Sequence, residues 1–411
     1  MRPTIETLRK YANLLVRKGA NVQKGQVVTI NASVDQHAFA CLVMEECYLA
    51  GAKKVNIDWG CDQQTRLNFT YADEDVLGTT LVWEEEKLKQ MVEDLPCRIF
   101  IESEDPDALA GLDVEKLSRV TQKRAKVRKP YRNAIDGRHQ WLIAAIPSAA
   151  WAKKCFPDHS EEEAMELLWD AILRTVRVEE NNDPLQEWQK HIDFMAAKAD
   201  WLNNQKLRSL RYSSSNGTDF TVDLIPEAKW EAANDLNITN NTTYIPNMPT
   251  EEVFTTPMAG KCEGTLVAVK PLSWNGQLIE DFSITFEDGK AVSCKAAKGQ
   301  ELLEKMLHMD EKACMLGEVA LVPKESPVNQ CGFLFYNTLF DENACCHVAI
   351  GAGFKEVLPN GEHLSAEEAE KMGINDSIIH VDFMVGADDL HIVGIREDGS
   401  EVDIFINGTY V

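Results

Sequence analysis

The sequence lacks two features that would place the protein on a membrane or on nucleic acid. It has no apolar run of about 18 residues, the length that a membrane-spanning helix needs. It is also short of basic residues: 42 Lys and Arg face 66 Asp and Glu, which gives a formal net charge of −24. This charge disfavours non-specific binding to nucleic acid or to an anionic membrane, so we expect neither as a partner.

Signs of secretion are also missing. The eleven cysteines are an odd number, and Cys345 and Cys346 are adjacent, which is atypical of a disulfide framework. The first 22 residues read as an amphipathic helix with charges throughout, without the apolar core of a signal peptide. We therefore expect reduced thiols and a cytoplasmic protein, and we interpret the two adjacent cysteines as small buried side chains.

Several common functional motifs are absent as well. The chain contains no GxGxxG after a strand, no GxxxxGK[ST], no HExxH, no CxxC pair and no GxSxG. These absences argue against a dinucleotide or P-loop site, a zincin, a zinc ribbon and an α/β-hydrolase. With 411 residues, of which 44% are hydrophobic, the chain is nevertheless long enough for two large folded domains.

The first half has the pattern of an α/β domain. Between residues 26 and 149 the strand-like runs VVTIN, KKVNID, CRIFIES and WLIAAIPSA alternate with longer helical segments. This alternation predicts a mostly parallel sheet covered by helices. Two further helices are predicted at 161–178 and 184–206, so we place the end of an N-terminal α/β domain at residue 206.

The second half has the pattern of an antiparallel sheet. Asn216-Gly217, Asp288-Gly289 and Asp398-Gly399 each lie between alternating apolar runs, which is a strong hairpin signal. A helix is predicted at 299–307. We expect residues 207–411 to form a β-rich α+β domain.

Four segments of the second half place metal-ligand residue types in apolar surroundings: 249–257, 316–323, 340–351 and 378–386. His380 and Asp382 are two apart in a strand-like run, so both point to one face. Glu318 interrupts an apolar strand, where an unpaired carboxylate is costly. Each residue alone also fits an ordinary structural role, such as an edge position, an ion pair or a hydrogen-bonded core histidine.

The combination of these residues favours a metal site. Glu252, Glu318, Glu342 and Asp382 carry four negative charges, which two divalent cations would balance. The imidazoles of His347 and His380 are ligands suited to zinc, cobalt or manganese. Two metals a few ångströms apart are a recurrent arrangement for hydrolysis.

At these segments the sequence resembles the aminopeptidase T and aminopeptidase S family of metallo-aminopeptidases. The likeness covers nearly the whole chain and is densest in EEVFTTP, GEVALVP, FYNTLFDENACCHVAIG and HVDFMVGADDLHIVGI. The resemblance implies an N-terminal α/β domain, a catalytic C-terminal domain, a homodimer and two divalent metal ions, which we take as Zn, Co, Mn or Mg. It also implies hydrolysis of the N-terminal bond of peptides with a free amino end, with broad specificity.

The ligands of the family fall on six residues of this sequence: Glu252, Glu318, Glu342, His347, His380 and Asp382. Glu251 is a weaker candidate than Glu252, because the family keeps the acid directly before Val-Phe. We assign the bridging position to Glu318 as a hypothesis. A general base is also required, and Glu318 or Glu342 could serve only if it is not fully committed to metal.

One position departs from the family. Where the family has a catalytic tyrosine, seven residues after His347, this sequence has Phe354. Loss of a hydroxyl that binds the oxyanion typically costs about 10²- to 10³-fold in rate. Tyr336 is a weaker candidate for a replacement hydroxyl. Two alternatives therefore stay open: a specialised two-metal amidase or dipeptidase, and a catalytically silent scaffold.

Overall fold

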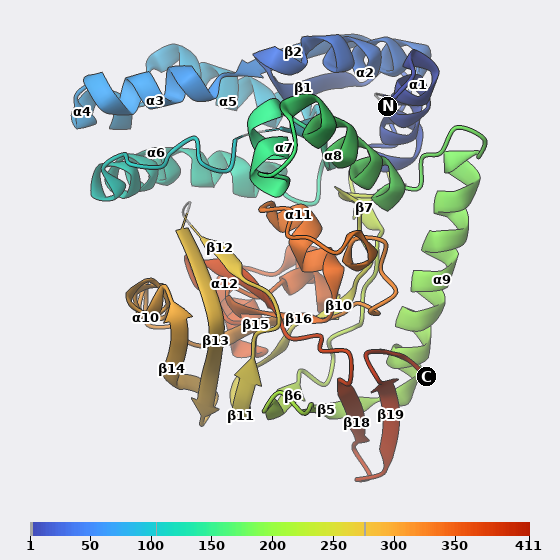
Figure 1. Cartoon of the computed structure of the whole chain (residues 1–411), viewed down its shortest axis with the longest axis vertical. Helices are drawn as coiled ribbons and strands as arrows, with labels where there is room; N and C mark the ends of the chain where they lie inside the picture. The colour runs from blue at the N-terminus through green and yellow to red at the C-terminus, as the bar shows by residue number, and fades with distance from the viewer. Residues whose placement is uncertain (1–2, 104, 275–276) are drawn as a thin grey trace. The chain divides into compact units, whose positions relative to one another are not determined.

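The computed structural model describes residues 3–103, 105–274 and 277–411, which form two compact units (Figure 1). The first unit extends to Gln189 and also takes in Asn234–Met248, and the second comprises Lys190–Ala233 and Pro249–Val411. The change from one unit to the other falls inside the long helix α9 (Pro184–Gln205). Residues 234–248 thus belong to the first unit although they follow part of the second unit in the sequence. The composition of the sequence around them gives no sign of this.

The first unit is built on a parallel sheet with the strand order β2-β1-β3-β4-β9. Its strands are β1 (Val27–Ser33), β2 (Lys54–Gly60), β3 (Cys97–Glu102), β4 (Trp141–Ala145) and β9 (Asn247–Met248). The predicted parallel α/β sheet is thus confirmed. Because β2 lies on one side of β1 and β3 on the other, the strand order reverses between β1 and β3.

The helices of this unit follow the apolar periodicity of the sequence. They are α1 (Ile5–Leu14), α2 (His37–Leu49), α3 (Asp62–Tyr71), α4 (Glu74–Gly78), α5 (Val82–Asp94), α6 (Val114–Ile135), α7 (Ala149–Cys155) and α8 (Glu161–Thr175). Along β1, which contacts α2, Val28, Ile30 and Ala32 are buried, whereas the alternate residues, including Asn31 and Ser33, are only half-buried. The second face of the sheet is therefore less completely covered than the first.

Short elements complete the first unit. They are the π-helix η1 (Leu15–Gly19), the 3-10 helix η2 (Val34–Gln36) and the two-stranded antiparallel pair of β7 (Asp235–Asn237) and β8 (Thr242–Tyr244).

The second unit contains a nine-stranded antiparallel sheet, in the order β12-β13-β11-β6-β5-β18-β19-β20 with β14 beside β13. Its strands are β5 (Leu207–Ser213), β6 (Asp219–Leu224), β11 (Pro257–Val267), β12 (Leu272–Trp274), β13 (Gln277–Glu287), β14 (Lys290–Lys298), β18 (His391–Arg396), β19 (Glu401–Ile406) and β20 (Thr409–Tyr410). The three predicted hairpins are confirmed as β5-β6, β13-β14 and β18-β19.

A smaller antiparallel sheet in the same unit has the order β10-β15-β16-β17. It consists of β10 (Val253–Thr255), β15 (Leu316–Leu321), β16 (His347–Gly351) and β17 (His380–Met384). Short helices surround it: α10 (Gln300–Leu307), η3 (Asn329–Cys331), α11 (Thr338–Asp341), η4 (Glu342–Ala344), η5 (Lys355–Val357), η6 (Gly361–His363) and α12 (Ala366–Lys371). Every residue of β15 and β16 is buried, so a polar side chain on these strands faces the interior.

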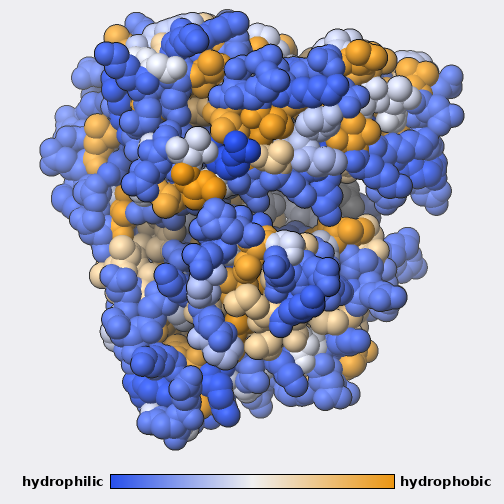
Figure 2. All heavy atoms as spheres, turned by 180° about the vertical axis from the view of Figure 1, so that it is seen from behind, coloured by the Kyte–Doolittle hydropathy of each residue, from blue (hydrophilic) through white to orange (hydrophobic). Residues whose placement is uncertain are grey.

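Hydrophilic side chains dominate the surface seen in Figure 2, in keeping with the acidic composition. Within the described residues, no helix combines the length and the apolar character needed to cross a membrane.

Candidate metal centre

The small sheet aligns four of the six predicted ligands by its register. Glu318 on β15 lies opposite Ala349 on β16, and Ala349 lies opposite Asp382 on β17. Directly opposed residues share one face of a sheet, as do residues two apart on a strand. His347 is two residues before Ala349, and His380 is two residues before Asp382. All four side chains therefore belong to one face.

A β-bulge at Gly317 gives Glu318 its orientation. Leu316 pairs with Ile350 and Glu318 pairs with Ala349, so two steps along β15 match one step along β16. Without the bulge Leu316 and Glu318 would point to the same face, but the inserted residue turns them to opposite faces. The glycine is required there because a Cβ on Gly317 would lie 2.1 Å from the backbone oxygen of Ala352.

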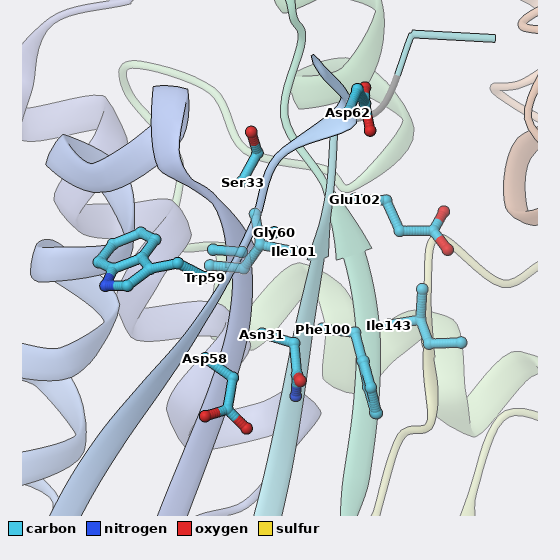
Figure 3. A pocket seen from close by; sticks show the side chains of 11 residues that line it. Asn31, Ser33, Asp58, Trp59, Gly60, Asp62, Phe100, Ile101, Glu102 and Ile143 are labelled. Atoms are coloured by element: carbon cyan, nitrogen blue, oxygen red, sulfur yellow. The ribbon is translucent and has the colours of Figure 1, made fainter. Parts of the chain in front are cut away.

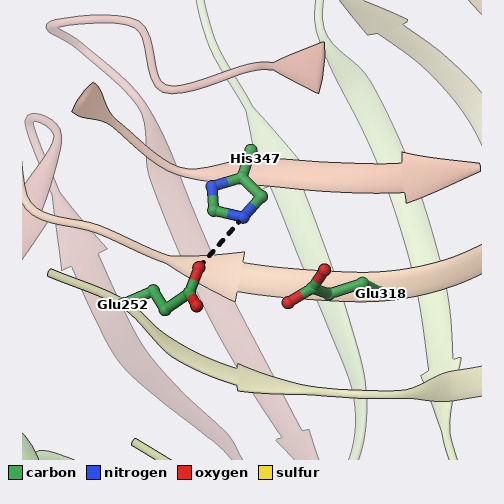
Figure 4. Close-up of side chains that lie close together, drawn as sticks. All are labelled: Glu252, Glu318 and His347. Carbon is green, nitrogen blue, oxygen red and sulfur yellow. Dashed lines mark ion pairs between the residues drawn. The ribbon is translucent and has the colours of Figure 1, made fainter. Parts of the chain in front are cut away.

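The ligand atoms of these residues form two overlapping groups. Nε2 of His347 lies 3.3 Å from Oε2 of Glu252, which directly precedes β10 (Figure 4). Nε2 of His380 lies 3.1 Å from Oε2 of Glu318 and 3.3 Å from Oδ1 of Asp382. One group is Glu252, Glu318 and His347, and the other is Glu318, His380 and Asp382; within each group the ligand atoms lie within 4.8 Å of one another. Glu318 is common to both groups.

Glu342, the sixth predicted ligand, begins η4 and lies beside these groups. Burial raises the pKa of its carboxyl group well above the usual value, and the neighbouring carboxylates of Asp382 and Glu252 raise it further. The structure thus brings all six predicted residues together, although Glu342 belongs to neither group of closely spaced ligand atoms.

The pKa values of three other residues of the site are also shifted, because several charged groups lie close together in a buried place. Burial, with Asp382 and Glu252 nearby, raises the pKa of Glu318 to about 7, although His380 partly offsets this. Burial lowers the pKa of His347, but the adjacent Glu252 outweighs it and brings the pKa to about 10. For Asp382, burial is outweighed by His380, so its pKa is lowered. Such a cluster of buried carboxylates is stable only with positive charge among them.

The donor set fits divalent cations. Oδ1 of Asp382 is buried and accepts no hydrogen bond from any described residue. Glu318 and His347 are 4% and 1% exposed, so neither side chain is solvated by bulk water. Carboxylate oxygens combined with imidazole nitrogens are the ligands that zinc, cobalt and manganese take in proteins.

Phe354 lies against the group formed by Glu318, His380 and Asp382. Its ring centroid is 4.8 Å from that of His380 and 5.6 Å from that of Phe254. Its backbone N–H donates to Oγ1 of Thr256 at 2.9 Å, which fixes the loop after β16. The position at which the resemblance implies a tyrosine hydroxyl is therefore adjacent to His380, and here it presents an apolar ring.

Tyr336 lines a cavity of about 170 Å³ together with Glu342 and Asp382. Leu272, Thr338 and Met384 supply part of the remaining wall. The backbone of Tyr336 is in the left-handed region, with φ of 57°, which is unusual for an aromatic residue.

Two supporting residues were not anticipated from the sequence. The buried carboxylate of Asp341 accepts hydrogen bonds from the backbone N–H groups of Phe335 and Asn337, on either side of Tyr336. Oδ1 of Asn343 accepts from the backbone N–H of Glu251 at 2.7 Å. The only feature of the sequence that could have pointed to Asp341 and Asn343 is that they flank Glu342 in the segment FDENA.

The side chain of Glu251 points away from the two ligand groups. Its Oε2 lies 3.6 Å from Nε2 of His191 on α9, and both side chains are buried. The same ring nitrogen of His191 lies 2.8 Å from the backbone oxygen of Thr250. These contacts hold the segment before β10, so that the adjacent Glu252 reaches His347.

Comparison with known proteins identifies the family of this chain. The family model of the thermophilic metalloprotease (M29) family matches residues 4–410. Aminopeptidase AmpS of Bacillus subtilis (strain 168) is 40% identical over 98% of each chain, and aminopeptidase PepS of Streptococcus thermophilus is 39% identical over 99% of this chain and 98% of its own. The structure of wild-type AmpT from Thermus thermophilus matches with a TM-score of 0.91 and 34% identity, covering 99% of both chains. The resemblance to aminopeptidases T and S is confirmed, and the chain belongs to the thermophilic metalloprotease (M29) family of metal-dependent hydrolases.

Proposed function

We propose that this protein is a metallo-aminopeptidase that removes the N-terminal residue of peptides with broad specificity. The observation that carries the proposal is the meeting of four carboxylates and two imidazoles from separate segments, five of them on or next to the small sheet. Membership in a metalloprotease family and the aminopeptidase names of full-length relatives support the same activity.

Two divalent ions are the proposed cofactors. Glu252 and His347 would hold one, His380 and Asp382 the other, and Glu318 would bridge them, because it alone belongs to both groups. Glu342 is the proposed additional ligand beside Asp382. Bound ions would supply Lewis-acid activation of water and of the scissile carbonyl.

The chain's own residues complete the proposed mechanism. Whichever of Glu318 and Glu342 keeps a carboxylate oxygen that is not committed to metal would accept the proton of the attacking water and return it to the leaving amine. The cavity beside Glu342 and Asp382 would receive the N-terminal residue of the peptide, and its acidic wall favours a protonated amino end. Its volume of about 170 Å³ and its mixed polar and apolar lining suit one residue without strict selection of the side chain.

The test is release of leucine from Leu-terminated peptides and a Leu-anilide by chelated protein reloaded with zinc, cobalt, manganese or magnesium. We expect metal-dependent release from free amino ends and none from N-acetylated copies of the same peptides. Equal cleavage of the acetylated copies would contradict an aminopeptidase.

Phe354 favours a second candidate, a specialised two-metal amidase or dipeptidase. A peptidase that lacks the family's hydroxyl would be slower on ordinary peptides, so a narrower substrate range is the alternative. A panel of peptides and amino acid amides separates the two candidates. Silence on the whole panel, in protein that still binds two equivalents of metal, would favour a silent scaffold.

The proposed partners are peptides with a free amino end and a second copy of the chain, and the proposed compartment is the cytoplasm. All eleven cysteines are free thiols in the structure, which supports a reducing compartment. Light scattering of the purified protein tests the homodimer, since a mass near 46.1 kDa would indicate a monomer.

A further inference from the structure

Each unit contains a cavity, and the two cavities differ in their relation to the candidate metal centre. The first unit has a cavity of about 360 Å³ at the carboxyl ends of β1, β2 and β3 (Figure 3), and none of the six candidate ligands lines it. Glu342 and Asp382 line the cavity of about 170 Å³ in the second unit. This volume is below the range of about 300–1,000 Å³ for small-molecule sites, so it suits a single residue of a peptide.

Tyr336, in the wall of the second cavity, has an unusual backbone conformation. Its φ of 57° lies in the left-handed region, which glycine adopts freely and a bulky residue adopts only at a cost in free energy. Residues in such conformations persist where their surroundings enforce them, and they cluster at binding and catalytic sites. A glycine would avoid the cost but would leave this part of the wall without a side chain. The tyrosine therefore points to a role for its side chain at the cavity.

The carboxylate of Asp341 enforces this conformation from both sides. Its Oδ1 accepts from the backbone N–H of Phe335 at 2.8 Å, and its Oδ2 accepts from the backbone N–H of Asn337 at 3.1 Å. Asp341 is 8% exposed, so water competes little for these two hydrogen bonds. Because both neighbours of Tyr336 are bound to one buried carboxylate, the backbone of Tyr336 cannot shift easily.

Aromatic packing anchors the same segment. The rings of Phe335 and Phe340 are fully buried and stacked, with centroids 4.6 Å apart and an interplanar angle of 14°. Phe335 directly precedes Tyr336, and Phe340 directly precedes Asp341. The stacking therefore holds together the two parts of the chain that the hydrogen bonds of Asp341 join, and this wall of the cavity is preorganised.

We propose that the side chain of Tyr336 sets the upper size limit for the N-terminal residue of the peptide, and that Asp341 is a positioning residue that acts through Tyr336. The inference rests on the proposed function, which makes this cavity the site of that residue. Leu272 and Met384 supply apolar wall, so an apolar side chain about as large as that of leucine would fit. A larger ring would meet Tyr336, which Asp341 keeps in place. A limit on size alone is compatible with broad specificity among smaller residues.

The test compares the binding of L-leucinol and L-tryptophanol to the metal-loaded protein by calorimetry. Both carry a free amine and no hydrolysable bond, and they differ in the size of the side chain. We expect leucinol to bind at least about tenfold more tightly than tryptophanol. Tyr336→Gly removes the ring and suits the left-handed backbone, so it should abolish this preference. Equal binding of the two alcohols by the unaltered protein, or an unchanged preference in folded Tyr336→Gly, would overturn the proposal.

A matched control makes the same kind of change away from the cavity. Asn360 has a φ of 56° and is not among the residues that line the second cavity, so Asn360→Gly should leave the preference unchanged. Thermal melts identify a variant that fails to fold. Tyr336→Asn, which also tolerates the left-handed backbone, then replaces Tyr336→Gly and carries the same expectation.

Asp341→Asn tests the positioning role. It keeps the shape of the side chain but replaces one acceptor oxygen by an amide NH₂ group, so it should release Tyr336 and reduce the preference for leucinol at least about threefold. In a protein that already carries Tyr336→Gly, the same substitution should change the preference no further. A general weakening of the fold would lower both affinities together and leave their ratio unchanged. A changed ratio in the double variant, relative to Tyr336→Gly, would refute the positioning role.

Release of leucine from a Leu-anilide tests the proposed function separately. Protein that shows the expected ratios of affinity but releases no leucine would contradict the peptidase and leave the size limit in place. Active protein that binds the two alcohols equally would contradict the size limit and leave the peptidase in place.

Discussion

Asp382 is the residue of the candidate metal centre that has an unpaired carboxylate oxygen. Its Oδ1 is buried without a hydrogen bond, and its only described counter-charges are the two imidazoles nearby. His380 outweighs the effect of burial and lowers the pKa of this carboxyl group, which favours its ionised form, and a bound cation would satisfy the unpaired oxygen. The sequence indicated this residue through its spacing from His380, since alternation in a strand is a local property.

Replacing Asp382 by Ala should therefore remove both metal retention and hydrolysis. Loss of a group that only supports a ligand costs about 10- to 100-fold in metal affinity, so loss of a ligand should cost more than about 100-fold. Metal content after gel filtration and leucine release are the two measurements. Asp403→Ala is the matched control, because Asp403 forms an exposed pair with His391 at 2.7 Å. Full activity of the Asp382 variant without bound metal would rule out the proposed centre.

Phe354 permits a prediction of gained function. Phe354→Tyr should raise turnover, by up to about 100-fold, because it restores a hydroxyl beside His380 that can donate to an oxyanion. The measurement is kcat on a Leu-anilide. Phe254→Tyr adds the same hydroxyl to the neighbouring ring and should have no such effect. An unchanged kcat for Phe354→Tyr would mean that the site has been rebuilt around an apolar ring.

At the scale of elements, the bulge in β15 decides whether Glu318 reaches the centre. Gly317 permits a close approach to the loop after β16, and the extra residue reverses the side on which Glu318 emerges. The sequence placed Glu318 in an apolar strand but could not predict its face, because a bulge depends on pairing with a strand that is distant in sequence.

Gly317→Ala should destabilise the second unit by about 1–3 kcal/mol, since the new methyl group cannot fit against the oxygen of Ala352. Metal affinity should fall in the same variant, because Glu318 would be displaced. Denaturant unfolding and metal titration measure the two effects. Gly60→Ala is the control, since a Cβ there meets nothing closer than 3.9 Å. Native metal affinity in Gly317→Ala would contradict the orienting role of the bulge.

At the scale of the whole molecule, the acidic residues are common throughout the chain, but the buried carboxylates that could bind metal lie in one unit only. The formal net charge of −24 belongs to the whole chain, whereas the four carboxylates of the candidate centre all lie in the second unit. A ligand that binds only the folded state stabilises the unit that holds it. Metal should thus stabilise the two units unequally.

Chelation should weaken the second unit more than the first. Removal of metal present at about a hundredfold excess over its dissociation constant costs about 3 kcal/mol per site, and the carboxylates then repel one another. Hydrogen exchange should accelerate in β15, β16 and β17 and stay nearly unchanged in β1 and β3. Equal acceleration in both units would refute the prediction.

The sequence by itself determined the identities of the ligand candidates, the parallel and antiparallel character of the two halves and the three hairpins, because periodicity and turn chemistry are local. The tertiary structure decided that β9 joins the first sheet, that the bulge aims Glu318, and that Glu252 meets His347. It also decided that Asp341 and Asn343 accept hydrogen bonds from the backbone beside Tyr336 and at Glu251. These features arise from pairing between distant segments, whose register no local pattern encodes.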